Sequence, residues 1–430
     1  MNSTASPTDR YLKVLEKHWG YTEFRGIQRD IIESIGAGRD TLGLMPTGGG
    51  KSITFQVPAM VLPGVCVVVT PLIALMKDQV AGLRKRHIRA AALHAGLGHE
   101  EILTILDNCV FGHYKFLYVS PERLSSEIFM AKFRHMEVSF VTIDEAHCIS
   151  QWGHDFRPAY LQIAELRKVK PDCPVLALTA TATPEVARDI QHVLRFRQEN
   201  VFRMSFYRPN LAYQVLWADF SLQSLRRVLE ADNGSCIIYR RSRQQCEDLS
   251  KVLNQWGFTS TFFHAGLSHP EKDKRQTLWV QDKVRIMVAT SAFGMGIDKA
   301  DVRLVVHLDI PDSIEEYFQE AGRAGRDGLP ARSIIILDGK ELQYSERRSG
   351  QRYPNVDYIR NVYEDICCYY QLAVGDGWHV TREFLPLSPL YASECTGHIV
   401  QCRIYQLPGC RGRAEPCACQ CHTQCLVQTP

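Results

Sequence analysis

Apolar residues along the chain fall into short runs rich in β-branched side chains, and stretches with helical spacing separate these runs. The runs are Val65 to Val69, Phe116 to Val119, Val138 to Ile143, Val175 to Leu178, Cys236 to Tyr239, Thr259 to Phe263, Arg285 to Ala289, Arg303 to Leu308 and Ser333 to Leu337. Strands that are apolar at consecutive positions are typical of parallel sheets covered by helices on both faces. The pattern therefore predicts an α/β fold with parallel sheets.

The runs form two sets, and the gap between them lies at Ser205 to Ala218, which shows no clear periodicity. Arg208-Pro209-Asn210 within this gap favours a turn. We therefore predict one α/β domain over residues 1–205 and a second over 206–345, with the same architecture used twice.

The pattern changes after Lys340. Apolar residues recur at helical spacing from Tyr353 to Tyr370, which predicts a helix within a third segment, residues 346–384. Residues 385–430 contain Pro, Gly, Gln and Cys without periodicity, so we expect an irregular, disordered tail that resembles a truncated or out-of-frame sequence.

Composition narrows the class of protein. The chain has 430 residues, of which 45% are hydrophobic and 23% charged, as in globular proteins of two domains. No apolar run approaches the roughly 18 residues of a membrane-spanning helix, and the polar N-terminus has no secretory pattern, so we expect a cytoplasmic protein without a membrane partner. The net charge of +3 does not by itself indicate nucleic acid.

Cysteines are distributed unevenly. The chain has 15, and the last of them crowd into Cys395 to Cys425. The spacing Cys417-x-Cys419-x-Cys421-His422-x2-Cys425 differs from the two-residue spacing of common zinc sites, and no apolar scaffold surrounds it. Zinc is therefore not expected as a cofactor.

A glycine-rich loop provides the first candidate chemistry. It is Met45-Pro46-Thr47-Gly48-Gly49-Gly50-Lys51-Ser52, between a predicted strand (Thr41 to Met45) and a predicted helix (Ile53 to Val61). In a P-loop, backbone amides and the lysine bind phosphates, and the hydroxyl of the last residue binds Mg²⁺. Met45 stands where the strict pattern has glycine, but the intact Gly50-Lys51-Ser52 and its flanks favour a P-loop over a chance loop.

Two carboxylates follow the apolar strand Val138 to Ile143. Asp144 and Glu145 would lie at the carboxyl edge of the sheet, opposite the P-loop, where one carboxylate can hold Mg²⁺ and the other can orient a water. Alone, such a pair is more often a solvated loop. Together with the P-loop it predicts that the first domain hydrolyses a nucleoside triphosphate, with Ser52 and Asp144 as metal ligands.

Two arginines in the second domain complete the predicted site. Arg323 and Arg326 lie in the glycine-spaced segment Gln319 to Gly328, directly after a helical pattern. An arginine can stabilise the charge on a transferring phosphoryl group, although a charged surface helix would give a similar sequence. The small residues around both arginines favour a close backbone approach and the catalytic role.

These segments, in this order, resemble the motif series of superfamily 2 helicases, specifically of the RecQ DNA helicases, across about residues 10 to 340. The sequence of these segments resembles that of bacterial members most. The segments that carry the resemblance are Gly20-Tyr21 with Phe24-Arg25 and Gln28, Thr47 to Ser52, Thr70-Pro71-Leu72 with Lys77-Asp78-Gln79, Asp144 to His147, the aromatic-rich Cys148 to Pro158, Thr179-Ala180-Thr181, Gly294 to Lys299, and Gln319 to Gly328.

The resemblance implies two tandem RecA-like domains, ATP and Mg²⁺ as cofactors, and roles for further residues. Tyr21, Arg25 and Gln28 would bind adenine, and Asp298 and Gln319 would contact the nucleotide from the second domain. Residues implied in DNA binding, or in its coupling to hydrolysis, are Gln151, Trp152, His154, Phe156, Arg157, Thr179, Thr181 and Thr290.

By the same resemblance, the expected function is ATP-driven 3′-to-5′ translocation on single-stranded and forked DNA, in repair and recombination at the bacterial nucleoid. Two alternatives stay open, an RNA helicase on the same frame and a DNA-dependent ATPase that binds DNA without unwinding it. Protein partners and the oligomeric state are not readable from the sequence.

Overall fold

The computed structural model describes residues 7–46, 48–71, 73–94, 96–151, 156–293, 299–352 and 355–370. The chain divides into two compact units, Met1–Ser345 and Glu346–Pro430. The first unit contains two parallel sheets, as the sequence pattern predicts. The predicted tail, residues 385–430, and its cysteines lie outside the described residues.

The first sheet has seven parallel strands within the described residues, in the order β3-β4-β2-β5-β6-β1-β7. Its strands are β1 (Thr41–Leu44), β2 (Val65–Val69), β3 (Ala90–Leu93), β4 (Phe116–Val119), β5 (Val138–Ile143), β6 (Val175–Thr179) and β7 (Val201–Arg203). The helices of this region are α1 (Pro7–Trp19), α2 (Gln28–Gly36), α3 (Lys51–Val61), α4 (Ile73–Lys85), α5 (His99–Val110), α6 (Glu127–His135), α7 (Ile163–Val169) and α8 (Pro184–Val193), with short 3₁₀ turns at Pro121–Arg123, Ala146–Ile149 and Pro158–Gln162.

Each face of this sheet packs against its own set of helices. One apolar cluster joins strand residues to α5, α6, α7 and α8, and a second joins the opposite strand face to α2, α3 and α4. Every residue of β1, β2, β4 and β6 is buried, so these strands are covered on both faces. Burial of both faces explains why these strands are apolar at consecutive positions.

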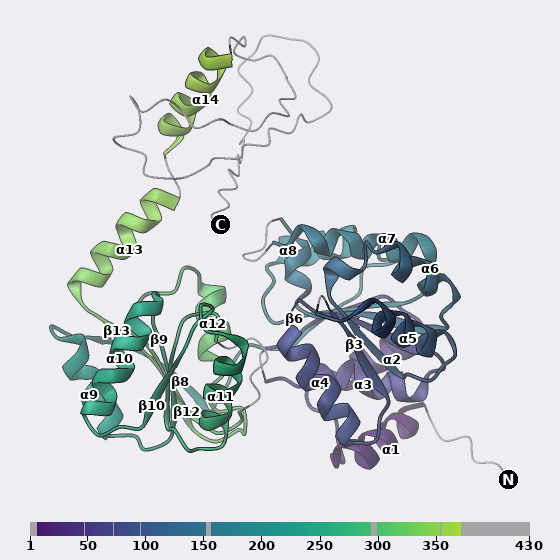
Figure 1. Ribbon diagram of the computed structural model, residues 1–430, viewed down its shortest axis with the longest axis horizontal. Helices are drawn as coiled ribbons and strands as arrows, with labels where there is room; N and C mark the ends of the chain where they lie inside the picture. The colour runs from purple at the N-terminus through teal and green to yellow at the C-terminus, as the bar shows by residue number, and fades with distance from the viewer. Residues whose placement is uncertain are drawn as a thin grey trace. The chain divides into compact units, whose positions relative to one another are not determined.

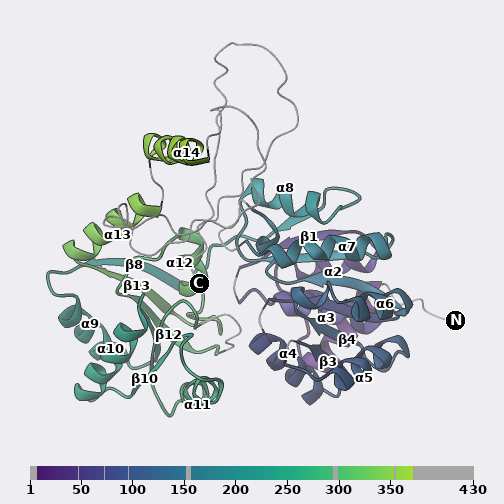
Figure 2. The ribbon, with the colours of Figure 1, turned by 45° about the horizontal axis from the view of Figure 1, so that its top comes forward.

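The second sheet has six parallel strands in the described part of the chain, in the order β10-β11-β9-β12-β13-β8. Its elements are β8 (Leu211–Trp217), α9 (Ser221–Glu230), β9 (Ser235–Tyr239), α10 (Arg243–Gln255), β10 (Ser260–Phe263), α11 (His269–Val280), β11 (Ile286–Ala289), β12 (Val302–His307), α12 (Ile314–Ala321) and β13 (Ala331–Leu337). Helices α9 and α10 cover one face, and α11 and α12 lie on the other (Figure 1). Figure 2 shows the same layers from a second direction.

Strand β8 corrects one expectation, because it lies inside the segment where no periodicity was found. It pairs with β13 over its whole length as an edge strand, and all of its residues after Leu211 are exposed. Its residues are apolar on both faces except at Gln214, so they neither alternate with polar residues nor form an unbroken run, and periodicity does not reveal the strand. Strands β3 and β7 also escape the pattern, since β3 is mostly alanine and β7 has three residues.

The last strand of the first sheet ends at Arg203, and β8 begins the second sheet at Leu211. Beyond the second sheet, α13 (Gly339–Arg352) and α14 (Val356–Tyr370) follow. The predicted helix from Tyr353 to Tyr370 overlaps α14 from Val356 to Tyr370, and Tyr353 lies outside the described residues. Helix α13 has little apolar pattern and was not expected. Of the helices in the described ranges, none has both the length and the apolar character that crossing a bilayer requires.

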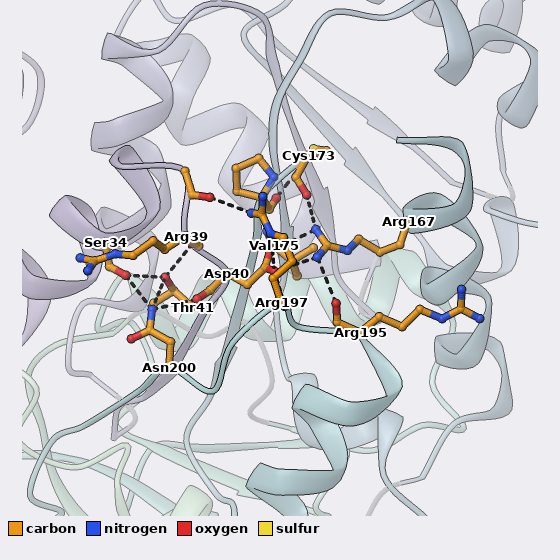
Figure 3. A network of polar contacts seen from close by, with 12 residues as sticks. Ser34, Arg39, Asp40, Thr41, Arg167, Cys173, Val175, Arg195, Arg197 and Asn200 are labelled. Carbon is orange, nitrogen blue, oxygen red and sulfur yellow. Dashed lines mark hydrogen bonds and ion pairs between the residues drawn. The ribbon is translucent and has the colours of Figure 1, made fainter. Parts of the chain in front are cut away.

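A buried polar network ties together the ends of the first sheet that lie opposite the P-loop (Figure 3). The Asp40 carboxylate, 1% exposed, accepts two hydrogen bonds from Arg167, at 3.1 and 2.7 Å, and others from the Val175 amide and from Arg197. The Asn200 side chain donates to the Asp40 carbonyl oxygen at 2.8 Å. The network joins four segments of the first domain and leaves the carboxylate fully bonded, as a buried charge requires.

Candidate functional site

The predicted phosphate-binding residues meet at the carboxyl edge of the first sheet because β1, β6 and β5 are neighbours there. The P-loop follows β1, Thr179 ends β6, and Asp144 follows β5. The Met45 amide donates to the Thr179 carbonyl oxygen at 3.0 Å, and the Asp144 amide donates to that of Val69 at 2.9 Å. Parallel strands thus bring together three motifs that are far apart in the sequence.

The P-loop has the backbone that its glycines allow. Gly48 and Gly50 have φ values of +80° and +77°, a region that residues with a Cβ rarely adopt. A Cβ at Gly50 would also lie 2.3 Å from the Nε2 atom of Gln28. Gly50 is the N-cap of α3, so the amides of that helix N-terminus and its dipole face an anion at the loop.

Lys51, Asp144 and Glu145 form one charged cluster. The Lys51 Nζ atom lies 3.3 Å from the Glu145 Oε1 atom, and the Glu145 amide donates to the Asp144 carboxylate at 3.0 Å. Burial, together with the charge of Glu145, raises the pKa of Asp144 to about 6. Burial also opposes ionisation of Glu145, but Lys51 and His147 outweigh it and lower the Glu145 pKa. The cluster therefore holds Lys51 and Glu145 charged beside a second carboxyl group.

Backbone strain and buried contacts place Glu145. Its φ of +49° is in the left-handed region, unusual for a residue with a side chain and frequent at functional sites. The Tyr160 hydroxyl donates to the Asp144 carbonyl oxygen at 3.0 Å. His147 is buried, with its Nδ1 atom 2.8 Å from the Thr179 hydroxyl and 3.5 Å from the Glu145 Oε2 atom. These contacts fix the carboxylates relative to β6.

The three residues assigned to adenine lie before and at the start of α2. The Arg25 guanidinium lies 5.6 Å from the centre of the Tyr21 ring. Gln28 is buried, and its Nε2 atom donates to the Gly49 and Gly50 carbonyl oxygens, both at 3.2 Å, while its Oε1 atom accepts the Arg25 amide at 2.9 Å. Gln28 thus connects the adenine segment directly to the P-loop.

The arginines of the second domain lie against this cluster. Side-chain carbons of Arg326 are within 3.2 to 3.8 Å of where a Cβ of Gly48 would be. Arg323 is 7% exposed. Burial raises the pKa of Glu145, and the charge of Arg323 helps to lower it, after the larger effects of Lys51 and His147. Arg326 therefore lies against the P-loop, and Arg323 is close enough to the carboxylates for its charge to act on Glu145.

The other predicted residues fall into four groups. Thr179 and Thr181 are buried beside the site, and Gln319 of α12 donates to the Thr181 hydroxyl at 3.5 Å. Thr290 is buried at the end of β11. Gln151 is exposed and Phe156 and Arg157 are partly exposed, next to the 3₁₀ turn that carries His147. Thr47, Trp152, His154 and Asp298 lie outside the described residues.

The sequence motifs did not reveal every residue that shapes the site. Tyr160 was not singled out, His147 was quoted without a role, and Arg208 and Asn210 were interpreted only as a turn. All four act through a hydrogen bond to a distant segment, at separations of up to 119 positions. No local spacing records such a bond.

Comparisons with known proteins define the class first. The DEAD/DEAH box helicase family matches residues 25–190, and the helicase conserved C-terminal domain matches residues 221–328. Among solved structures, the Mss116p double deletion bound to single-stranded RNA and AMP-PNP superposes with a TM-score of 0.65 at 16% identity, over 82% of this chain and 78% of that one. Mycobacterium smegmatis Lhr bound to single-stranded DNA and AMP-PNP gives 0.61 at 19% identity, over 77% and 47%. These likenesses establish the two-domain helicase fold.

Curated relatives then define the family. The probable ATP-dependent DNA helicase RecS of Bacillus subtilis is 39% identical over 78% of this chain and 68% of its own length. ATP-dependent DNA helicase RecQ of Pasteurella multocida is 42% identical over 76% of this chain and 52% of its own length. The chain belongs to the RecQ family of DNA helicases. It spans about half the length of the bacterial RecQ proteins that it matches.

Proposed function

We propose that this chain is an ATP-dependent DNA helicase that couples ATP hydrolysis to 3′-to-5′ movement along single-stranded DNA. The observation that carries the proposal is the cluster of Lys51, Glu145 and Asp144 at the carboxyl edge of the first sheet, with Arg326 packed against Gly48. It combines a phosphate-binding cation, a general base and a stabiliser of transition-state charge. Family membership supports the choice of nucleic acid.

In the proposed reaction, the P-loop amides and Lys51 hold the β and γ phosphates. Glu145 is kept ionised by Lys51 and can accept a proton from the attacking water, since its pKa is lowered. Arg326 lies against the P-loop and the charge of Arg323 acts on Glu145, so both arginines would stabilise the charge on the transferring phosphoryl group. Gln28 contacts the P-loop and would also bind the adenine base.

The donor set also fits Mg²⁺. Asp144 and the Ser52 hydroxyl supply oxygen ligands of the kind this cation prefers. The pKa of Asp144 is raised by its burial and then by the charge of Glu145, and a divalent cation would offset both effects. When bound, the cation would neutralise charge on the phosphates. Asp144 and Ser52 are the residues proposed to hold it.

DNA would bind at the aromatic-rich segment from Gln151 to Arg157 and at Thr290. Thr179, Thr181 and Gln319 would couple DNA binding to ATP hydrolysis. Aromatic and arginine side chains stack on and contact single strands without reading their sequence. We propose that the chain acts on forked DNA in repair and recombination. The proposed location is the nucleoid in the cytoplasm of a bacterial cell.

ATP hydrolysis by the purified chain tests the proposal. We expect turnover that rises with single-stranded DNA more than with RNA of equal length at the same salt concentration, because nucleic-acid affinity depends strongly on salt. Lys51→Ala is the matched control for contaminating ATPases. Stimulation by RNA alone would favour an RNA helicase, and hydrolysis without strand displacement on a 3′-tailed duplex would favour a DNA-dependent ATPase that does not unwind.

A further inference from the structure

The segment that joins β7 to β8 reaches into the arginine segment of the second domain. Arg208 donates from its guanidinium to the Gly322 carbonyl oxygen, at 2.9 Å, and to that of Gly325. These carbonyl groups belong to the peptide bonds immediately before Arg323 and Arg326. One planar guanidinium therefore restrains the backbone at both arginines, which the single ammonium of a lysine would not reproduce.

Asn210 restrains the same segment from the other side. Its Nδ2 atom donates to the carbonyl oxygens of Gly325 and Leu329, at 2.8 and 2.9 Å. The main-chain carbonyl oxygen of Asn210 accepts a hydrogen bond from the backbone amide of Ala331, at 2.8 Å, at the start of β13. The turn that carries Arg326 is thus fastened to the beginning of the second sheet.

Gly325 shows how closely these groups approach. Its φ is +60°, and a Cβ there would lie 2.6 Å from the Asn210 Nδ2 atom and 2.9 Å from the Ala331 Cβ atom. Only glycine leaves room for this contact and adopts this backbone without strain. The contact is therefore built into the turn.

The other end of the same segment is fixed to the nucleotide half of the site. The Met204 amide donates to the Leu44 carbonyl oxygen at 2.9 Å, where β1 ends and the P-loop begins. The Met204 sulfur lies 3.3 Å from where a Cβ of Gly26 would be, next to the adenine residues. Residues 204 to 210 thus connect the P-loop strand to the arginine turn over a short length of chain.

We propose that Arg208 and Asn210 are positioning residues that hold Arg323 and Arg326 in the geometry that phosphoryl transfer needs. The inference rests on the proposed ATP hydrolysis and adds residues that do not touch the nucleotide. Small displacements of a charge-stabilising group weaken catalysis strongly, because its benefit depends on preorganisation. A purely structural role would instead lower stability and leave the chemistry of the folded protein unchanged.

The test is a mutant cycle on the full chain, measured as kcat, KM for ATP and nucleotide affinity at saturating single-stranded DNA. Arg208→Ala, Arg208→Lys and the isosteric Asn210→Asp are each compared in the native background and in a background with Arg323→Ala and Arg326→Ala. In the native background we expect kcat to fall by about 10- to 100-fold with nucleotide affinity nearly unchanged. In the arginine-free background each change should alter kcat by less than about threefold, because groups that act as a unit are not additive.

Arg285→Ala is the matched control. The Arg285 guanidinium also donates to backbone carbonyl oxygens, those of Gly234 and Leu229 at 3.1 and 2.9 Å, but these lie beside the starts of β9 and β11 and do not belong to the arginine turn. It should lower the melting temperature without lowering kcat.

Equal losses of kcat in both backgrounds would overturn the inference, and so would native kcat in both Arg208→Lys and Asn210→Asp. If Arg208→Ala fails to fold, these two milder variants decide the question. Absence of DNA-stimulated hydrolysis in the wild-type chain would overturn the proposed function as well, which separates the two failures.

Discussion

The two halves of the candidate nucleotide site are held in place by different forces. In the first domain, charges of opposite sign fix one another, with Lys51 3.3 Å from Glu145 in a partly buried cluster. In the second domain, hydrogen bonds from Arg208 and Asn210 to backbone carbonyl groups fix the turn that carries Arg326. The charged cluster of the first domain lies entirely at the edge of one sheet. The arginine turn of the second domain depends on hydrogen bonds from the chain segment between the two sheets.

This difference predicts how each half fails. Under the proposed function, removing a charge from the first half would leave its partners uncompensated and would remove ground-state contacts with phosphate. Removing an arginine from the second half would take away a group used mainly in the transition state, so nucleotide affinity would be spared.

Lys51→Ala should give the largest loss of hydrolysis. It removes the P-loop ammonium and leaves Asp144 and Glu145 as neighbouring carboxyl groups without that cation. We expect turnover to fall by about 10³-fold or more, consistent with the weight of electrostatic stabilisation in phosphoryl transfer. The measurement is DNA-stimulated ATP hydrolysis, with a thermal melt to show that the variant folds. Turnover within tenfold of wild type would contradict the P-loop role.

Glu145→Gln should separate binding from cleavage. The amide has the shape of the carboxylate and can still accept a hydrogen bond from Lys51, but it cannot act as a base. We expect nucleotide affinity within about threefold of wild type and cleavage reduced by about 10²- to 10⁴-fold. Equilibrium binding of a fluorescent ATP analogue and single-turnover hydrolysis measure the two effects. A parallel loss of affinity would show that Glu145 serves in binding.

Arg326→Ala should have a smaller effect that is confined to the chemical step. We expect kcat to fall by about 10²- to 10³-fold while affinity stays near that of wild type, because an arginine finger acts on charge that develops during transfer. Arg332→Ala is a suitable control, since Arg332 pairs with Asp232 in the same domain. A loss in affinity with kcat preserved would make Arg326 a binding residue.

The same contrast decides how much the sequence could predict. The P-loop and the Asp144-Glu145 pair each lie in one short segment at the end of a strand, and a parallel sheet forces such ends together, so both were found from spacing. Strands with both faces buried were found for a related reason, because burial imposes a continuous apolar run. Strand β8 lies at an exposed edge, and its apolar residues are interrupted by Gln214, so burial imposes no continuous run on it.

The supports of the arginine turn could not be predicted in this way. Arg208 contacts a carbonyl group 114 positions away, and a backbone acceptor places no constraint on side-chain identity at that position. The glycine at 325 was visible as part of a glycine-spaced segment, but its partner was not. Strain at Glu145 was equally hidden, since its backbone angle depends on the surrounding structure.

Asp40→Asn should have the smallest effect on hydrolysis and a clear effect on stability. Asp40 belongs to the first domain's charge-paired architecture but lies at the end of the sheet opposite the P-loop (Figure 3). Asparagine keeps the size of the side chain but removes the charge that Arg167 and Arg197 neutralise. Breaking a buried pair of this kind costs about 3 kcal/mol. Chemical denaturation at pH 7 measures the loss, and kcat of the folded variant should equal that of wild type.

The pH dependence of the stability difference between wild type and Asp40→Asn shows whether the charge of Asp40 causes it. Burial opposes ionisation of Asp40, but hydrogen bonds from the Arg197 amide and from the Arg197 and Arg167 guanidinium groups outweigh it and lower its pKa. A lowered pKa stabilises the fold fully above the unfolded value of about 3.9 and loses that effect as the pH falls through the folded value. The stability gap between wild type and Asp40→Asn should therefore be constant near neutrality and shrink below about pH 4. A gap that stays unchanged into acid would mean that Asp40 contributes through packing alone and that charge pairing does not hold this end of the sheet.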